Sequence, residues 1–165
     1  MPQLVPIMIG NTSASVEKAL GQVLAPYLAD PSNAFVISSD FAHWGLRFRY
    51  TYYQPSTGSA THLKASAKAP KDPEIRESIK AVDLECIRAC ESGSHENWLS
   101  CLDDTGNTVC GRHPIGVMMA AVEVLRTEDG KRDIGGFRFV RYERSSEVKK
   151  VSESSVSYAS AFAVL

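Results

Sequence analysis

The chain has 165 residues, and its formal net charge is −1 because 18 Lys and Arg stand against 19 Asp and Glu. This near-neutral balance offers no basic field for a nucleic-acid backbone or an anionic membrane, so neither partner is expected. A hydrophobic content of 44% and a charged content of 22% are ordinary globular values, and they predict a single domain over residues 1–165. No apolar run approaches the ~18 residues of a membrane-spanning helix, and residues 1–10 lack the basic start of a signal peptide.

The first part of the chain predicts a strand, a helix and a second strand. Leu4–Ile9 and Ala34–Ser38 are continuous apolar runs, which are typical of buried strands. Between them we expect a helix that a serine caps, at Ser13 or Ser15, and that ends near Leu28. The short links favour a parallel βαβ unit. The expected apolar face of the helix comprises Val16, Ala19, Leu20, Val23, Leu24 and Tyr27.

The middle of the chain predicts a loop followed by three helices. Residues 54–73 are rich in Pro, Ser, Ala, Thr and Lys and show no period, so we expect a flexible surface loop. Helical spacing of apolar residues predicts an amphipathic helix over 74–91 and a shorter helix over 95–102. Residues 114–125 are apolar nearly all round and begin with proline, which indicates a buried helix.

Two strands are expected to close the chain, over 134–142 and 155–164. In the first of them we expect Phe139 and Tyr142 on opposite faces. The predicted fold class is therefore α/β, with a central sheet that starts as a parallel βαβ unit, ends in antiparallel strands and is flanked by helices.

The four cysteines predict free thiols rather than a disulfide framework or a zinc ribbon, because no paired CxxC spacing occurs. We therefore expect a reducing compartment, the cytosol or the nucleus. Cys86, Cys90 and Cys101 fall at core-like helix positions and are interpreted as packing residues.

The segment from Ser38 to Gly45 (SSDFAHWG) is the first candidate for chemistry, because it follows the carboxyl end of a predicted strand. Asp40 and His43 could form a general acid/base pair, a proton relay or a metal-ligand pair. In the alternative interpretation, Asp40 caps a turn and His43 forms a hydrogen bond in the core.

The segment from Asn107 to Gly116 (NTVCGRHPIG) is the second candidate. Cys110 lies just before the predicted helix, whose positive end favours a thiolate, and Arg112 and His113 add cationic or proton-donating groups. Such a thiolate could be a soft metal ligand or a nucleophile. The alternative is a buried packing thiol, with His113 as a helix cap.

The segment from Leu46 to Tyr53 alternates arginines with aromatic residues. Arg47 and Arg49 could stack on bases or hold a phosphorylated peptide, but a sheet-edge strand shows the same alternation, and we favour that structural interpretation. His62 and His95 receive no predicted role.

Four blocks of the sequence, in order, resemble the Memo family, named for a mediator of growth-factor-receptor-driven cell motility. The blocks are residues 27–33, 35–50, 110–116 and 154–159. The resemblance implies a fold similar to class III extradiol dioxygenases, a pocket that binds iron or copper and supports redox chemistry, and a role with receptor phosphopeptides and the cytoskeleton.

Carried onto this sequence, the resemblance implies that Cys110 is the cysteine metal ligand and that His43 and Asp40 are the pocket histidine and acid, with Asp40 orienting His43. It also implies that the chain is the C-terminal half of a Memo-like protein, and that the other half supplies two further histidines. Trp44, Arg47 and Arg49 are the expected contacts for a phosphotyrosine peptide or a cytoskeletal regulator. Half a sheet leaves an unpaired edge, so self-association is a further expectation.

Overall fold

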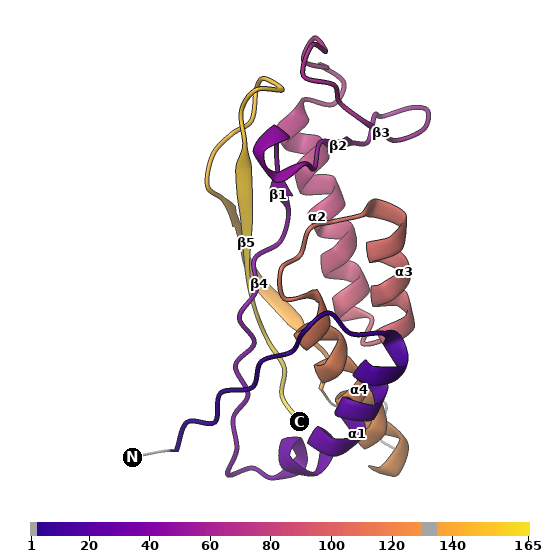
Figure 1. Cartoon of the computed structure of the whole chain (residues 1–165). Helices are drawn as coiled ribbons and strands as arrows, with labels where there is room; N and C mark the ends of the chain where they lie inside the picture. Colours follow the sequence, from indigo (N-terminus) through magenta and orange to yellow (C-terminus); the bar gives the residue numbers. More distant parts are fainter. Residues whose placement is uncertain (1–2, 130–134) are drawn as a thin grey trace.

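The computed structural model describes residues 3–129 and 135–165 (Figure 1). The helices are α1 (Ala14–Ala29), α2 (Ile75–Glu91), α3 (His95–Thr105), α4 (Arg112–Asp129) and the short 3₁₀ helix η1 (Leu46–Phe48). The strands are β1 (His43–Trp44), β2 (Tyr52–Tyr53), β3 (Thr61–His62), β4 (Arg138–Arg144) and β5 (Ser155–Phe162). Ile134, the expected start of the first closing strand, lies outside the described residues.

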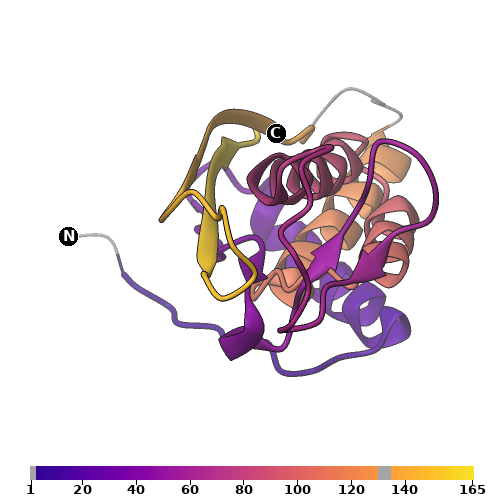
Figure 2. The ribbon, with the colours of Figure 1, turned by 90° about the horizontal axis from the view of Figure 1, so that it is seen from above.

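The described part of the chain combines four α-helices and the short η1 with two small antiparallel sheets, which confirms the α/β fold class. One sheet has the order β1-β5-β4, and the other pairs β2 with β3. Seen from above, β4 and β5 lie along one side of the helices (Figure 2). Both closing strands are therefore confirmed, and they pair antiparallel as expected.

The predicted parallel βαβ unit is wrong for the part of the chain that the structure describes. Leu4–Ile9 and Ala34–Ser38 form no strand. A strand persists only where its backbone N–H and C=O groups bond to a neighbouring strand, and no described strand pairs with either segment. Their side chains are exposed or half-buried, and Leu4 is 91% exposed and Val36 95%.

Residues 34–37 line one wall of an apolar cavity of about 670 Å³. Helix α4, β4, β5 and the last residues of the chain form the other walls, with Ile115, Val122 and Phe139 among the lining side chains. Of the two predicted strand segments, 34–38 therefore borders this cavity, whereas 4–9 does not line it. Self-association there stays a prediction.

Helix α1 is confirmed, and the Ser13 hydroxyl caps it by accepting a hydrogen bond from the Val16 N–H.

The predicted apolar face of α1 is wrong, because the buried residues are Glu17, Gly21 and Ala25, whereas Val16 is 44% exposed. The small side chains let α1 approach α4 so closely that a Cβ at Gly21 would lie 2.7 Å from the Ala121 backbone nitrogen. The close contact between α1 and α4 therefore buries a different face of α1 from the one that its apolar residues predict. The remaining predicted face residues, Ala19, Leu20, Val23, Leu24 and Tyr27, are exposed or half-buried.

Helices α2 and α3 match the prediction and share the core with the buried helix α4. The apolar stripe of α2 is buried along its length, and Trp98 and Leu102 of α3 pack into the same cluster as Cys86 and Cys90. Helix α3 ends at Gly106, whose left-handed φ of 59° lets its N–H reach the Leu102 carbonyl. No helix among the described residues is both long and apolar enough to cross a membrane.

A bulge in β4 changes which of its side chains face inward. The register against β5 shifts between Phe139 and Arg141, so the strand gains one residue there. As a result Phe139 and Tyr142 both pack against the main core cluster. The expectation that they lie on opposite faces is wrong for that reason.

The segment 46–53 is not one edge strand, contrary to the favoured interpretation. It forms η1, then a turn in which Arg49 has a left-handed φ of 57°, and then β2. Segment 54–73 has little regular structure, as expected, and contains only the two residues of β3, which pair with β2. Its flexibility stays a prediction.

Candidate metal centre

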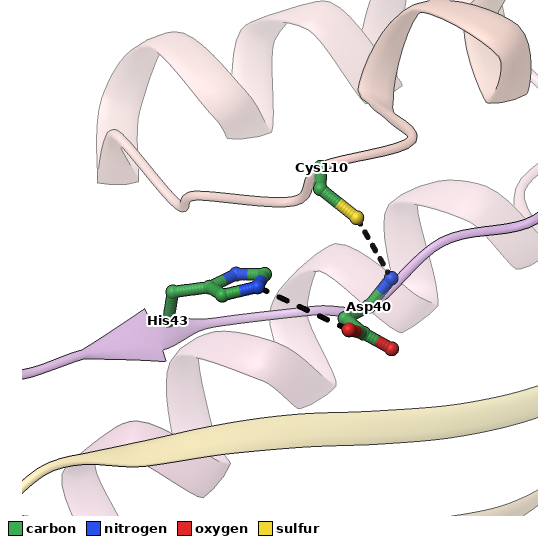
Figure 3. Close-up of side chains that lie close together, drawn as sticks. All are labelled: Asp40, His43 and Cys110. Carbon is green, nitrogen blue, oxygen red and sulfur yellow. Dashed lines mark hydrogen bonds and ion pairs between the residues drawn. The ribbon is translucent and has the colours of Figure 1, made fainter. Parts of the chain in front are cut away.

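Two segments that are far apart in the sequence meet at the candidate site (Figure 3). Residues 39–43 lead into β1, and residues 108–111 lead into α4. The Cys110 N–H donates to the Asp40 carbonyl at 3.2 Å, and the Asp40 N–H donates to the Cys110 Sγ at 3.1 Å. These reciprocal bonds place the thiol directly beside Asp40, so the two predicted constellations form one site.

Two further bonds tie the segments together. The Gly111 N–H donates to the Ser39 Oγ at 2.9 Å, and the His43 N–H donates to the Thr108 Oγ1 at 2.8 Å. A side chain at Gly111 would collide with the Ser39 side chain, so this approach requires glycine. The backbone of the site is therefore held by bonds on both sides of the ligand groups.

The side chains of Asp40, His43 and Cys110 gather their donor atoms in one place. One carboxylate oxygen, one imidazole nitrogen and the thiol sulfur all lie within 4.8 Å of one another. The His43 Nε2 is 4.0 Å from the Asp40 Oδ2, and the two side chains are 23% and 43% exposed. The cluster is thus rigidly supported behind and open to solvent in front.

The tautomer of His43 follows from its second ring nitrogen. The His43 Nδ1 lies 3.1 Å from the Thr108 carbonyl oxygen, which can only accept, so Nδ1 carries the proton. The Nε2 lone pair then faces Asp40 and Cys110. The Phe48 and His43 rings pack in a T-shaped arrangement, with the centroids 5.4 Å apart. Thr108 therefore orients His43, in place of the expected Asp40, whose 4.0 Å separation is too long for a hydrogen bond.

These residues fit a transition-metal ion by the chemistry of their donors. A thiolate, an imidazole and a carboxylate together suit iron, copper or zinc better than magnesium or calcium. If all three side chains bound an ion, the side of the cluster that is open to solvent would leave coordination positions free, as in catalytic metal sites. The Asp40 N–H also donates to the Cys110 sulfur and so helps to fix its position in the cluster.

A buried acidic group, which sequence reasoning missed, supports the site from behind. Asp83 of α2 is fully buried, and its Oδ1 accepts the Ala42 N–H at 3.1 Å and the Asn107 Nδ2–H at 2.9 Å. Ala42 and Asn107 immediately precede His43 and Thr108. One carboxylate thus holds both segments in register.

The other residues predicted for the site lie outside the cluster. Trp44 is 1% exposed, and its Nε1–H donates to the Tyr52 carbonyl, so its indole offers no surface for a direct contact with a partner. Arg47 and Arg49 are exposed on and beside η1. The Arg47 guanidinium lies over the Phe48 ring, 4.4 Å from its centroid.

His113 does not join Cys110, contrary to one expectation from the sequence. Its Nδ1 pairs with the Glu17 Oε1 at 2.6 Å, while the Glu17 Oε2 pairs with the His95 Nε2 at 2.6 Å. Glu17 and His95 are each 1% exposed. This network joins α1, α3 and the start of α4. No signal in the sequence pairs these residues, because Glu17 lies outside the apolar face that the sequence of α1 predicts.

Comparison with known proteins identifies the family of the chain. The sequence profile of the Memo-like protein family matches residues 2–162. The chain belongs to the Memo family. The resemblance inferred from the sequence blocks is therefore confirmed, and the matched range contains Asp40, His43 and Cys110.

Several curated Memo relatives align with nearly all of this chain. It is 42% identical to the protein MEMO1 of Danio rerio over 157 residues, which are 94% of this chain and 46% of that protein. A MEMO1 family protein of Schizosaccharomyces pombe is 39% identical over 164 residues, which are 98% of this chain and 51% of that protein. The protein MEMO1 of Homo sapiens is 38% identical over 156 residues. The chain thus spans about half the length of the curated Memo relatives that it matches.

Proposed function

We propose that this chain binds a transition-metal ion, iron or copper, through Cys110, His43 and Asp40. The observation that carries the proposal is the convergence of three unlike donor atoms within 4.8 Å of one another. The Memo resemblance implies the same Cys110 ligand and the same pocket histidine and acid. When bound, such an ion would supply one-electron redox chemistry at an open coordination position.

The residues of the chain have separate tasks in this proposal. The Cys110 sulfur donates charge to the ion, and the Asp40 N–H holds that sulfur in place at 3.1 Å. The His43 Nε2 offers its lone pair because Thr108 keeps the ring proton on Nδ1. The Asp40 carboxylate either serves as the third ligand or accepts a proton at Oδ2 from a molecule that enters from solvent.

Titration of the metal-free full chain with ferrous iron and with cuprous copper, each against a competing chelator, tests this proposal. We expect Cys110→Ala and His43→Ala to weaken the affinity by more than about 10- to 100-fold, which is the loss that second-layer changes around metals already cause. His62→Ala is the matched control, since His62 is exposed on β3 and should leave the affinity unchanged. Equal affinity of the parent chain and Cys110→Ala would contradict the proposal.

A second candidate function is the binding of a phosphotyrosine peptide, which the Memo resemblance implies for growth-factor-driven motility. The exposure of Arg47 and Arg49 beside the site favours it, because guanidinium groups pair with phosphate through two hydrogen bonds. Binding of a tyrosine peptide with and without phosphate tests it. We expect phosphate-dependent binding that Arg47→Gln with Arg49→Gln removes. Equal binding of the two peptides refutes this second function.

A further inference from the structure

Two buried thiols outside the candidate metal centre touch each other. The sulfur of Cys86 on α2 lies 3.3 Å from the sulfur of Cys101 on α3. Cys86 is completely buried and Cys101 is 8% exposed. A disulfide needs a sulfur–sulfur distance of about 2.05 Å, so the gap to close is only slightly more than about 1 Å, which side-chain rotation and a small helix shift can supply.

The surroundings of the two sulfurs give them different chemical characters. A hydrogen bond with Cys86 lowers the pKa of the Cys101 thiol, and it therefore favours a thiolate at the more exposed of the two sulfurs. That same bond, together with burial, raises the pKa of Cys86, which stays a thiol. The Asn107 Nδ2–H also donates to the Cys86 sulfur at 3.3 Å. The pair thus combines a sulfur that forms a thiolate more readily with one that stays protonated.

We propose that Cys86 and Cys101 are a reversible redox pair that a hydroperoxide converts to a disulfide. The Cys101 thiolate attacks the O–O bond of hydrogen peroxide, which forms an S–OH group and releases hydroxide. The Cys86 sulfur then attacks the Cys101 sulfur, the S–OH bond breaks, and the released hydroxide takes the Cys86 proton as water. In total two thiols lose two electrons and two protons, and one hydrogen peroxide is reduced to two waters. A transient disulfide of this kind suits a reducing compartment, where redox-sensing pairs occur.

A series of contacts through Asn107 and Thr108 also connects the Cys86–Cys101 pair to the candidate metal centre. The Asn107 side chain that contacts Cys86 also donates to Asp83, and Asn107 precedes Thr108, which holds His43. Withdrawal of the Cys86 sulfur toward α3 removes one of the two contacts of the Asn107 amide. We expect oxidation to shift His43 and weaken metal binding there. This last step rests on the proposed function, whereas disulfide formation does not.

Mild oxidation of the metal-free full chain with hydrogen peroxide, followed by thiol blocking in denaturant, tests the redox pair. We expect a mass lower by two hydrogen atoms before blocking, and two thiols fewer to block. Tryptic cleavage after Lys80, Arg88 and Arg112 separates Cys86 from the other cysteines, so a disulfide joins peptides 81–88 and 89–112. Fragmentation of that joined pair should place the bond at Cys101, and dithiothreitol should reverse it.

Single substitutions identify which cysteine bonds to Cys86, independently of the peptide mapping. Cys86→Ser and Cys101→Ser should each abolish the joined peptides, whereas Cys90→Ser, also buried on α2, and Cys110→Ser should keep them. A parent chain that retains a free Cys86 while Cys101 or Cys110 becomes sulfinic acid would overturn the proposal. So would a bond from Cys86 to Cys90 or Cys110. Because metal is absent throughout, these results do not depend on the metal proposal.

Discussion

Replacement of Asp83 by alanine should lower the free energy of unfolding by about 4 kcal/mol, because each buried donor left without an acceptor costs about 1–3 kcal/mol. Asp83 is completely buried and accepts hydrogen bonds from the Ala42 N–H, the Asn107 amide and the Tyr142 hydroxyl. These donors come from the two site segments and from β4. Chemical denaturation of the variant and the parent chain measures the effect.

The matched control is Asp103→Ala, since Asp103 is exposed near the end of α3 and should change the free energy of unfolding by less than about 0.5 kcal/mol. We also expect Asp83→Ala to weaken metal binding, because Ala42 and Asn107 precede His43 and Thr108. A loss of stability no larger than that of the control would show that Asp83 does not hold the segments together.

The stability contribution of Asp83 should depend on pH in a defined direction. Burial raises the pKa of the Asp83 carboxyl above its ordinary value of 3.8, although hydrogen bonds from Ser157, Asn107 and Tyr142 oppose the shift. A raised folded-state pKa means that the contribution is complete below pH 3.8 and is lost as the pH rises through the folded value. The stability of the parent chain relative to Asp83→Asn should therefore fall over that interval. If the stability of the parent chain relative to Asp83→Asn rose with pH instead, the raised pKa of the Asp83 carboxyl would be contradicted.

Replacement of Glu17 by alanine should lower the free energy of unfolding by about 3 kcal/mol, because the His95 and His113 imidazoles lose the buried carboxylate to which they bond. The Glu17 carboxylate bonds to His95 and His113 at 2.6 Å each, and it is almost completely buried. Without it, the buried His95 Nε2 loses its partner, and the His113 Nδ1 keeps only the Thr12 hydroxyl at 3.1 Å. Thermal and chemical unfolding should both register the loss.

Gln22→Ala is the control for this second substitution, because Gln22 is exposed on the same helix and should be nearly neutral. Glu17→Gln should recover part of the stability, since an amide oxygen can still accept one hydrogen bond. If Glu17→Ala were as stable as the control, the network would not join α1 to α3 and α4.

Local sequence rules predicted the helices because each helix carries its own signals. The spacing of Ile75, Ile79 and Val82 sets the buried stripe of α2, and Ser13 sets the start of α1. The same rules named all three residues of the candidate metal centre, Asp40, His43 and Cys110. They could not show that Asp40 and Cys110 touch, because that contact joins residues 70 positions apart.

The predictions that failed all depend on contacts between residues that are far apart in the sequence. Leu4–Ile9 has the pattern of a buried strand, but burial requires neighbours on both faces, and the described residues supply none. The face of α1 depends on the close approach of Gly21 to Ala121, which hydrophobicity does not encode. Asp83 and Glu17 read as ordinary helix surface residues, because only tertiary packing buries them.

The central claim, that Cys110 is a metal ligand, is tested most directly by the absorption spectrum of the chain loaded with cobalt(II). A thiolate bound to cobalt gives a sulfur-to-metal charge-transfer band in the near ultraviolet, which nitrogen and oxygen ligands do not give. We expect this band in the parent chain and in Cys90→Ser, and its loss in Cys110→Ser. A band that persists in Cys110→Ser, or cobalt bound to the parent chain without the band, would contradict the metal centre proposed for Asp40, His43 and Cys110.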